Sequence, residues 1–347
     1  MNSDGPSGLP PESRQGRRAR QRRRSSTVLA ISTVLVAALA VTALVIVSPQ
    51  GRSAASSPKA TTTTTTVKIY VPNPVQPILR PAQPGEGRWA VRDTWHAGEP
   101  LVATTFLRTS PSATAYVSWI RSRATQLGLY LGYKGPGSTN LNRGPELVPY
   151  SGRGRLLATF NSGFYESDST EGFYTHGTLY FPMVNNHATL VAYGDGRYDV
   201  INWTAGRRPP PGVVIARQNL HMLVNNGAPA SGVNVGSNWG ITLHGVPNVW
   251  RTGVGVDKRG DLIYVAASSQ TAASLAQIFI HLDCVRAMQL DINPEWPIFV
   301  TYGSPGAGNP TLDVPNPNQV RSRFLYTSTK DFFAVYVRQY GKSEAPW

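Results

Sequence analysis

The sequence predicts an α+β fold: a β-rich ectodomain with few helices, preceded by one transmembrane helix and a disordered stalk. Three observations lead to this prediction. A run of apolar, uncharged residues follows an arginine cluster near the N-terminus. A segment rich in Ser, Thr and Pro comes next. Most of the remaining chain consists of short apolar or alternating runs bounded by Gly, Pro and Asn, which is typical of strands.

We therefore divide the chain into four parts: a basic cytoplasmic tail (1–27), a transmembrane helix (28–47), a linker (48–88) and a folded ectodomain (89–347). The ectodomain is long enough for one large domain, or for two small ones, with a substantial core.

The transmembrane prediction rests on Val28–Val47, which contains no charged residue. About twenty residues at 1.5 Å rise match the roughly 30 Å hydrocarbon core of a bilayer. The arginines before it keep the N-terminus in the cytoplasm, so the remainder of this single-pass cell-membrane protein lies outside the cytoplasm. A cleaved signal peptide is the alternative, with Ser53-Ala54-Ala55 as a weak cleavage site. The apolar region of a signal peptide usually has about 7–15 residues, and this run is longer, so an uncleaved anchor is favoured.

The linker, Ser48–Arg88, includes the threonine run Thr61–Thr66 and five prolines in its second half. Such a composition cannot bury enough apolar surface to offset its ordering entropy. Prolines also favour the extended polyproline II conformation. We therefore expect an extended stalk.

The net charge of +14 does not indicate a nucleic-acid partner. Most of the excess positive charge lies in the tail and the linker. Arginines beside a membrane span are explained by topology and by anionic lipid, so the predicted partner is the lipid bilayer. The single cysteine, Cys284, excludes an intrachain disulfide and is expected to be a buried, inert thiol.

Two segments of the ectodomain have helical spacing. The first is predicted over 110–127, with Ser110 as its cap and Pro111 at the permitted first position. The second is predicted from about Ala272 to Leu282, and His281 falls off its apolar stripe, where we expect it to be solvated. The remaining apolar runs are predicted strands, among them Leu156–Phe160, Thr178–Phe181, Thr189–Tyr193, Val213–Ile215, Met222–Val224, Gly253–Val256, Leu262–Ala266, Ala287–Leu290 and Ile298–Thr301.

Four patches, in the same order along the chain, resemble the phosphodiester glycosidase family. They are the strand Leu157–Phe160 with Asn161-Ser162-Gly163-Phe164-Tyr165, the strand end Leu223–Gly227, the hairpin Arg251–Leu262, and the helix and strand Ser274–Asp291. The resemblance implies a hydrolase that acts on a glycosyl phosphodiester or a related envelope glycoconjugate, with a glycan or glycosyl phosphate as its partner.

The sequence departs from the family at one important place. Where the family has Asp-Gly-Gly-Gly-Ser, this chain continues from Asp291 as Ile-Asn-Pro-Glu-Trp. Consecutive glycines let a ligand approach the backbone amides closely, whereas Pro294 has no amide to donate. Either Glu295 supplies a new carboxylate, or the chain is an inactive carbohydrate-binding or envelope scaffold protein on the same fold.

Four residues are candidates for catalysis. Arg251 could bind a departing phosphate, because its guanidinium is always charged and matches two phosphate oxygens; the alternative is a surface ion pair. Asp291 ends an apolar strand and could act as nucleophile, base or metal ligand, or simply cap a turn. Glu295 could share its pocket. His176 is the histidine best suited to move a proton near neutral pH.

Five residues are candidates for substrate binding. The resemblance places Asn161, Gly163 and Asn225 at the ends of strands that lead to the site, although Asn161 could equally occupy a left-handed turn. Trp296 could stack on a sugar or belong to the core. Glu166 lies in an acidic loop beside the expected pocket.

No cofactor is assigned, and a divalent cation is the open candidate. Asp291, Asn293 and Glu295 alternate like the start of a calcium loop, but Trp296 stands where that loop needs glycine.

Overall fold

A computed structural model of the chain describes residues 70–93, 99–135, 143–165, 168–169, 171–242, 245–303 and 307–339. All of them belong to one compact unit, Thr64–Trp347. The predicted tail, the span Val28–Val47 and the threonine run lie outside the described residues. No helix in the described ranges combines the length and the apolar composition that a bilayer crossing requires.

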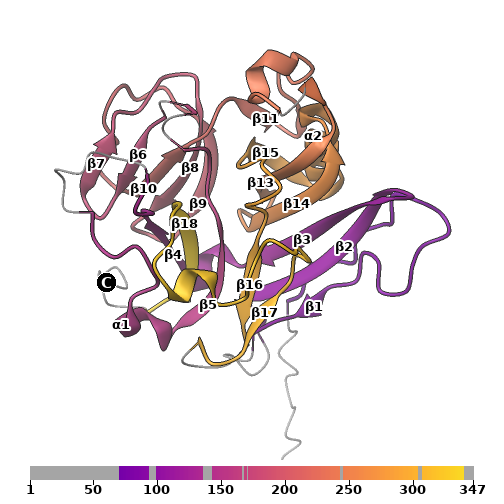
Figure 1. The fold of residues 1–347 in the computed structure, drawn as a ribbon, viewed down its shortest axis with the longest axis horizontal. Coiled ribbons are helices and arrows are strands. Elements are labelled where there is room, and N and C mark those ends of the chain that lie inside the picture. Colours follow the sequence, from indigo (N-terminus) through magenta and orange to yellow (C-terminus); the bar gives the residue numbers. More distant parts are fainter. Residues whose placement is uncertain are drawn as a thin grey trace, which may run out of the picture. The chain divides into compact units, whose positions relative to one another are not determined.

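Three antiparallel sheets make up the described unit (Figure 1). The largest has eight strands in the order β1 (Ala90–Val91), β2 (Val102–Ser110), β3 (Ala113–Ile120), β14 (Leu262–Gln270), β13 (Val249–Asp257), β15 (Cys284–Gln289), β11 (Met222–Asn225) and β12 (Ala228–Pro229). A five-stranded sheet has the order β7 (Thr178–Phe181), β6 (Phe173–Thr175), β10 (Val213–Gln218), β8 (Ala188–Tyr193) and β9 (Tyr198–Asn202). The third has the order β17 (Pro310–Leu312), β16 (Phe299–Tyr302), β5 (Leu156–Asn161), β18 (Phe332–Val337) and β4 (Thr125–Tyr130).

The β-rich fold with few helices is confirmed. The described helices are α1 (Tyr150–Arg153), α2 (Ala272–His281) and the short 3-10 turns η1 (Ser122–Ala124), η2 (Gly236–Trp239) and η5 (Arg323–Leu325). The predicted strands are all present, with bounds that differ by a few residues. Cys284 begins β15 with its thiol buried, as expected.

Helix α2 covers one face of the largest sheet, where it packs against β11, β13, β14 and β15. Thr271 and Ser274 form a reciprocal cap: the Ser274 amide donates to Thr271 Oγ1 (3.1 Å) and the Thr271 amide to Ser274 Oγ (2.9 Å). Leu275 and Phe279 are buried against the sheet, while His281 is exposed as predicted. The apolar stripe thus places the N-terminus of α2 beside the end of β14.

Aromatic side chains join the largest sheet to the β5 sheet. The Phe160 ring lies 5.1 Å from Phe333 and 5.8 Å from Phe299, measured between centroids, and 5.2 Å from Tyr264 on β14. All four rings are fully buried. This packing fixes the end of β5, where the candidate site begins.

The predicted helix over 110–127 is wrong. The segment forms the β2–β3 hairpin, η1 and the start of β4. Ser110 pairs with Ala113 across the turn that contains Pro111. Along β3, Ala113, Ala115, Val117 and Trp119 lie on one face and are buried, and burial alternates with the other face until Ser118 and Ile120 are buried too, so the true period is two and not 3.6.

Residues 70–88 pack on the folded domain instead of extending freely. The Tyr70 ring lies 5.8 Å from Trp119, and its carbonyl accepts a hydrogen bond from Arg121 Nη2 (2.7 Å). Glu86 is buried and accepts the Arg108 amide (2.8 Å). The described folded part therefore begins upstream of the expected boundary at Trp89.

Candidate active site

Arg251, on β13, is a buried cation held by neutral oxygens. Its side chain is 4% exposed. Nε donates to the Gln270 carbonyl (2.9 Å), and Nη1 donates to the Trp239 carbonyl (3.3 Å) and to Gln289 Oε1. No carboxylate among the described residues pairs with it. Burial lowers the pKa of Arg251 to about 10, so the guanidinium remains charged at pH 7.

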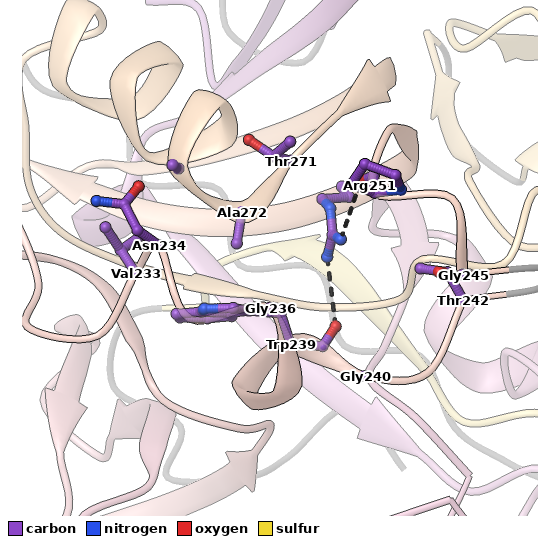
Figure 2. A pocket seen from close by; sticks show the side chains of 12 residues that line it. Val233, Asn234, Gly236, Trp239, Gly240, Thr242, Gly245, Arg251, Thr271 and Ala272 are labelled. Atoms are coloured by element: carbon purple, nitrogen blue, oxygen red, sulfur yellow. Dashed lines mark hydrogen bonds between the residues drawn. The ribbon is translucent and has the colours of Figure 1, made fainter.

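The Arg251 cavity, of about 310 Å³, lies beside this guanidinium (Figure 2). The η2 segment, including Trp239, forms one part of its wall, and the first turn of α2, Thr271–Ala273, forms another. The first amides of a helix have no partner within the helix and carry partial positive charge. The cavity therefore combines an uncompensated cation with a helix N-terminus, an arrangement suited to an anion.

Asp291 lies two residues beyond β15 and is only 2% exposed. Its backbone is fixed to Thr252, whose amide donates to the Asp291 carbonyl (2.8 Å) and whose hydroxyl accepts the Asp291 amide (2.9 Å). Its carboxylate accepts Lys330 Nζ on one oxygen and the Asn293 amide (2.8 Å) on the other. Burial raises the pKa of Asp291, and the Lys330 ammonium opposes that effect.

Two aromatic rings surround the Asp291–Lys330 ion pair. Lys330 Nζ lies 4.4 Å from the Tyr165 ring centroid and 5.2 Å from that of Trp296. The two rings meet edge to face at 5.9 Å. Asp291 does not line the Arg251 cavity, although the two residues sit on paired segments. The structure thus places Arg251 and Asp291 in adjacent but separate surroundings.

A second buried ion pair adjoins the first. Arg217 on β10 donates through Nε to Asp331 Oδ2 (2.9 Å) and through Nη2 to the Phe164 carbonyl (2.7 Å). Asp331 Oδ1 accepts no hydrogen bond from any described residue. Asp331 also contributes to the raised pKa of Asp291. Sequence reasoning missed Lys330, Asp331 and Arg217; the one available indication was a charged pair placed directly before the apolar run 332–337.

The segment that replaces the family's glycines is held by its own side chains. The Asn293 amide donates to Asp291 Oδ1, the Glu295 amide to Asn293 Oδ1 (2.9 Å) and the Trp296 amide to the Asn293 carbonyl (3.0 Å). Asp291 and Asn293 thus each stabilise a turn by accepting the backbone amide two residues later, so the turns form without glycine. Glu295 is exposed, in contrast to Asp291. Within the described ranges, no group of three or more His, Cys, Asp or Glu is placed to hold a metal ion.

Asn161 and Gly163 shape the backbone at the end of β5. Asn161 Nδ2 donates to Thr252 Oγ1 (2.9 Å), and its Oδ1 accepts the Tyr264 hydroxyl (2.7 Å). A Cβ on Gly163 would lie 2.6 Å from Asn219 Oδ1. The structure gives both residues a structural role, and their contact with substrate stays a prediction.

Asn219, which sequence reasoning also missed, explains the glycine. Its Oδ1 accepts the Phe164 amide (2.9 Å), and its Nδ2 donates to the carbonyls of Gln289 (3.1 Å) and Leu290 (2.9 Å). One buried amide thereby links the chain after β5 to the end of β15, next to Asp291.

The other candidates lie elsewhere. Asn225 ends β11 and lines a second cavity. His176 forms the β6–β7 turn with Gly177, both at positive φ, and lies 5.9 Å from the Tyr130 ring. Burial lowers the pKa of His176 to about 4, so it is neutral at pH 7, and its part in moving a proton stays a prediction. Trp296 packs beside Lys330, and Glu166 lies outside the described residues.

Comparison with known proteins supports the resemblance. Residues 154–291 match the family model described as phosphodiester glycosidase, a segment that contains Arg251, Asn219 and Asp291. The resemblance predicted from the sequence is confirmed for this segment. No match was found among curated proteins.

Three solved structures show weaker similarity. The zebrafish N-acetylglucosamine-1-phosphodiester alpha-N-acetylglucosaminidase catalytic domain, auto-inhibited by its pro-peptide, has a TM-score of 0.45 and 19% identity, covering 71% of this chain and 87% of that chain. A hypothetical protein from Synechocystis has a TM-score of 0.41 and 11% identity, covering 68% and 62%. A protein described as exported from Burkholderia pseudomallei K96243 has a TM-score of 0.37 and 12% identity, covering 69% and 75%.

Proposed function

We propose that this chain, whose residues 154–291 match the phosphodiester glycosidase family, is a membrane-anchored hydrolase that cleaves a glycosyl phosphodiester outside the cytoplasm. The single observation that carries the proposal is Arg251. A buried guanidinium without a carboxylate partner among the described residues lies at a cavity that also includes the first turn of a helix.

Arg251 would bind the phosphate and stabilise its growing charge. Cleavage of the glycosidic bond leaves the bonding electrons on the phosphate oxygen, so negative charge increases there as the bond breaks. A cation fixed in advance in a partly dehydrated site stabilises that charge more than water does. The pKa of Arg251 remains about 10, so the cation persists across neutral pH. The N-terminus of α2 adds donors at the same cavity.

A carboxylate at the anomeric carbon is the second requirement of such cleavage. Asp291 remains the candidate, because it follows a strand paired with the Arg251 strand. To reach a sugar, its contact with Lys330 has to loosen and the rings of Tyr165 and Trp296 have to separate. The proposal therefore includes a local rearrangement of the 291–296 segment on substrate binding.

A second candidate function follows from the burial of Asp291. Asp291 is already neutralised by Lys330 and is nearly inaccessible. If this arrangement persists when ligand binds, the domain binds a glycosyl phosphate without cleaving it. The chain is then a carbohydrate-binding or scaffold protein of the envelope.

The location is part of the proposal and is supported by the sequence alone. Val28–Val47 would anchor the chain, with the arginine cluster in the cytoplasm. The domain would then meet glycans of the cell envelope.

Sugar release from a panel of sugar-1-phosphodiesters, including nucleotide sugars, tests the proposal. The full-length chain in detergent would be assayed with and without a divalent cation. Removing one preorganised donor to a developing charge typically costs about 100- to 1,000-fold in rate, so Arg251→Ala should lose at least about 100-fold. Arg197→Ala is the matched control, because the Arg197 side chain is 60% exposed and its one ion pair among the described residues is with the surface residue Asp195.

The outcomes separate the two candidates. Turnover that survives Arg251→Ala would contradict the role of Arg251 in cleavage, and a wild-type chain that releases sugar from none of the substrates would contradict the hydrolase proposal. Binding of a sugar phosphate without turnover, lost in Arg251→Ala, would support the binding protein. If Asp291 is the catalytic carboxylate, Asp291→Asn should bind substrate with unchanged circular dichroism and release no sugar.

A further inference from the structure

A second cavity, of about 530 Å³, has four asparagines among the ten residues that line it. We call it the amide hollow and define it by Asn186, Asn202, His221, Asn225, Ser231 and Asn238. The segment 230–239 contributes to both cavities: Gly232 and Asn238 line the amide hollow, whereas Val233 and Trp239 line the Arg251 cavity. The two cavities are therefore built on one loop.

The lining of the amide hollow suits a neutral ligand rich in hydroxyl groups. None of the described residues that line it is an acid, a lysine or an arginine. An Asn amide offers two donors and an acceptor, which matches hydroxyl groups that both donate and accept. The side chains of Asn186, Asn202 and Asn225 make no hydrogen bond to any residue in the described ranges, so these groups are available to a ligand.

The amides are held on well-defined backbone. Asn202 ends β9 and Asn225 ends β11. Asn186 adopts a left-handed conformation (φ 67°), which Asn tolerates better than most residues, and its amide donates to the Trp203 carbonyl (2.8 Å). The His221 ring lies 6.4 Å from the Trp239 ring, measured between centroids. Fixed positions reduce the ordering that a bound ligand would require.

We propose that the amide hollow is a subsite for a neutral sugar residue, so that the ligand is a glycan carrying the phosphodiester and not a lone sugar phosphate. The phosphate would lie in the Arg251 cavity, and a neutral sugar unit of the same molecule would lie in the hollow. The placement of the phosphate rests on the proposed function, whereas the binding of a neutral sugar in the amide hollow does not depend on it.

Ligand-observed NMR can test the neutral sugar directly. The probes are methyl glycosides of glucose, galactose, mannose, arabinose and N-acetylglucosamine, which carry no charge and cannot use Arg251. A single open sugar subsite should bind with a dissociation constant on the order of 1 mM. With the full-length chain in detergent, at least one glycoside should show saturation transfer. The double variant Asn202→Ala/Asn225→Ala should weaken this binding about tenfold or more.

A control variant makes the result specific. Asn73→Ala removes an exposed amide that lines neither cavity and should leave sugar binding unchanged. If no glycoside binds at about ten times the expected dissociation constant, or if the double variant binds as the wild type does, the subsite is overturned. Neither result affects phosphodiester cleavage, which is measured separately and depends on Arg251.

Discussion

At the scale of single residues, Arg251 and Lys330 are buried cations with opposite surroundings. Proteins usually bury a charge only when it is paired, because its desolvation is costly. Lys330 has the Asp291 carboxylate, whereas Arg251 has carbonyl and amide oxygens. An incoming anion would therefore complete the surroundings of Arg251 but would compete with Asp291 for Lys330. This difference is why we assign the phosphate to Arg251.

Lys330→Met should destabilise the fold strongly. The substitution keeps a long apolar side chain between Tyr165 and Trp296 but leaves the Asp291 carboxylate buried without its cation. Breaking a buried pair from one side typically costs about 3–5 kcal/mol, and urea denaturation would measure the loss.

The double variant Lys330→Met/Asp291→Asn provides the control, because it removes the uncompensated charge. It should recover most of the lost free energy of unfolding. Equal stability of the single and double variants would contradict the buried ion pair as described.

At the scale of elements, Asn219 joins segments that are distant in sequence. Its amide holds the chain after β5 against the end of β15, and Gly163 leaves the space for it. The site therefore depends on strand ends that converge, with side-chain amides fixing their separation.

Gly163→Ala should reduce stability by about 1–3 kcal/mol, because the new methyl group would lie 2.6 Å from Asn219 Oδ1 and force the amide to move. The same substitution should cost less in an Asn219→Ala background, where the contact with Oδ1 is removed and only that with Cβ, at 3.2 Å, remains. A double-mutant cycle by chemical denaturation measures this coupling. Simple additivity of the two substitutions would show that Gly163 and Asn219 do not restrict each other.

The β13–β14 hairpin contains a carboxyl group that should make stability depend on pH. Asp261 accepts Trp119 Nε1 (3.2 Å) and the Ser122 amide (3.1 Å), and burial, with a contribution from Asp257, raises its pKa to about 6. Its usual pKa is near 3.8. Between these values the folded state binds more protons than the unfolded state. The contribution of Asp261 to the free energy of unfolding therefore increases as pH falls from 6 to 4 and is lost as pH rises.

Asp261→Asn removes this titration. The free energy of unfolding of the variant minus that of the wild type should be about 2–3 kcal/mol higher at pH 7 than at pH 4. The loss of the carboxylate acceptor adds a constant to this difference at both pH values and does not change that result. Denaturation at both pH values gives this difference. Asp195→Asn is the control of opposite sign, because hydrogen bonds from Arg197 lower the pKa of that exposed carboxyl. A difference that does not change with pH would contradict the shift at Asp261.

Nine of the eighteen described strands, together with α2, coincide with runs named from the local pattern. These were found because their apolar period and caps are read within a few residues of one another. The helix predicted over 110–127 failed because Val117, Ile120, Ala124 and Leu127 happen to follow a helical spacing within a β pattern. There, pairing of β3 with β2 and β14 decides the structure, and such long-range pairing is not contained in a short window.

The site shows the same limit. Arg251 and Asp291 were found because each stands in a recognisable motif. Lys330 was missed because its contact with Asp291 spans 39 residues and depends on β18 pairing with β5. Gly163 was found as part of a motif, but its reason, the close approach of Asn219, requires the three-dimensional structure.

At the scale of the whole molecule, charge and hydropathy are distributed unevenly along the chain. The arginine cluster, the uncharged run Val28–Val47 and the threonine-rich segment precede the folded unit in that order. This order is what a tethered extracytoplasmic domain requires: a retained basic tail, a span and a spacer. The prediction that Val28–Val47 anchors the chain can be tested independently of any activity.

Fractionation of cells that express the full-length chain should recover it intact in the membrane fraction, resistant to extraction by alkaline carbonate. A chain that begins at Ser48 should lose this association, because about twenty apolar residues provide the membrane affinity. Protease added outside intact cells should digest the folded part and leave the arginine cluster protected. Mass spectrometry of the N-terminus distinguishes the anchor from a cleaved signal peptide. A mature chain that begins just after Ala55 would show cleavage, and the domain would then be released from the membrane.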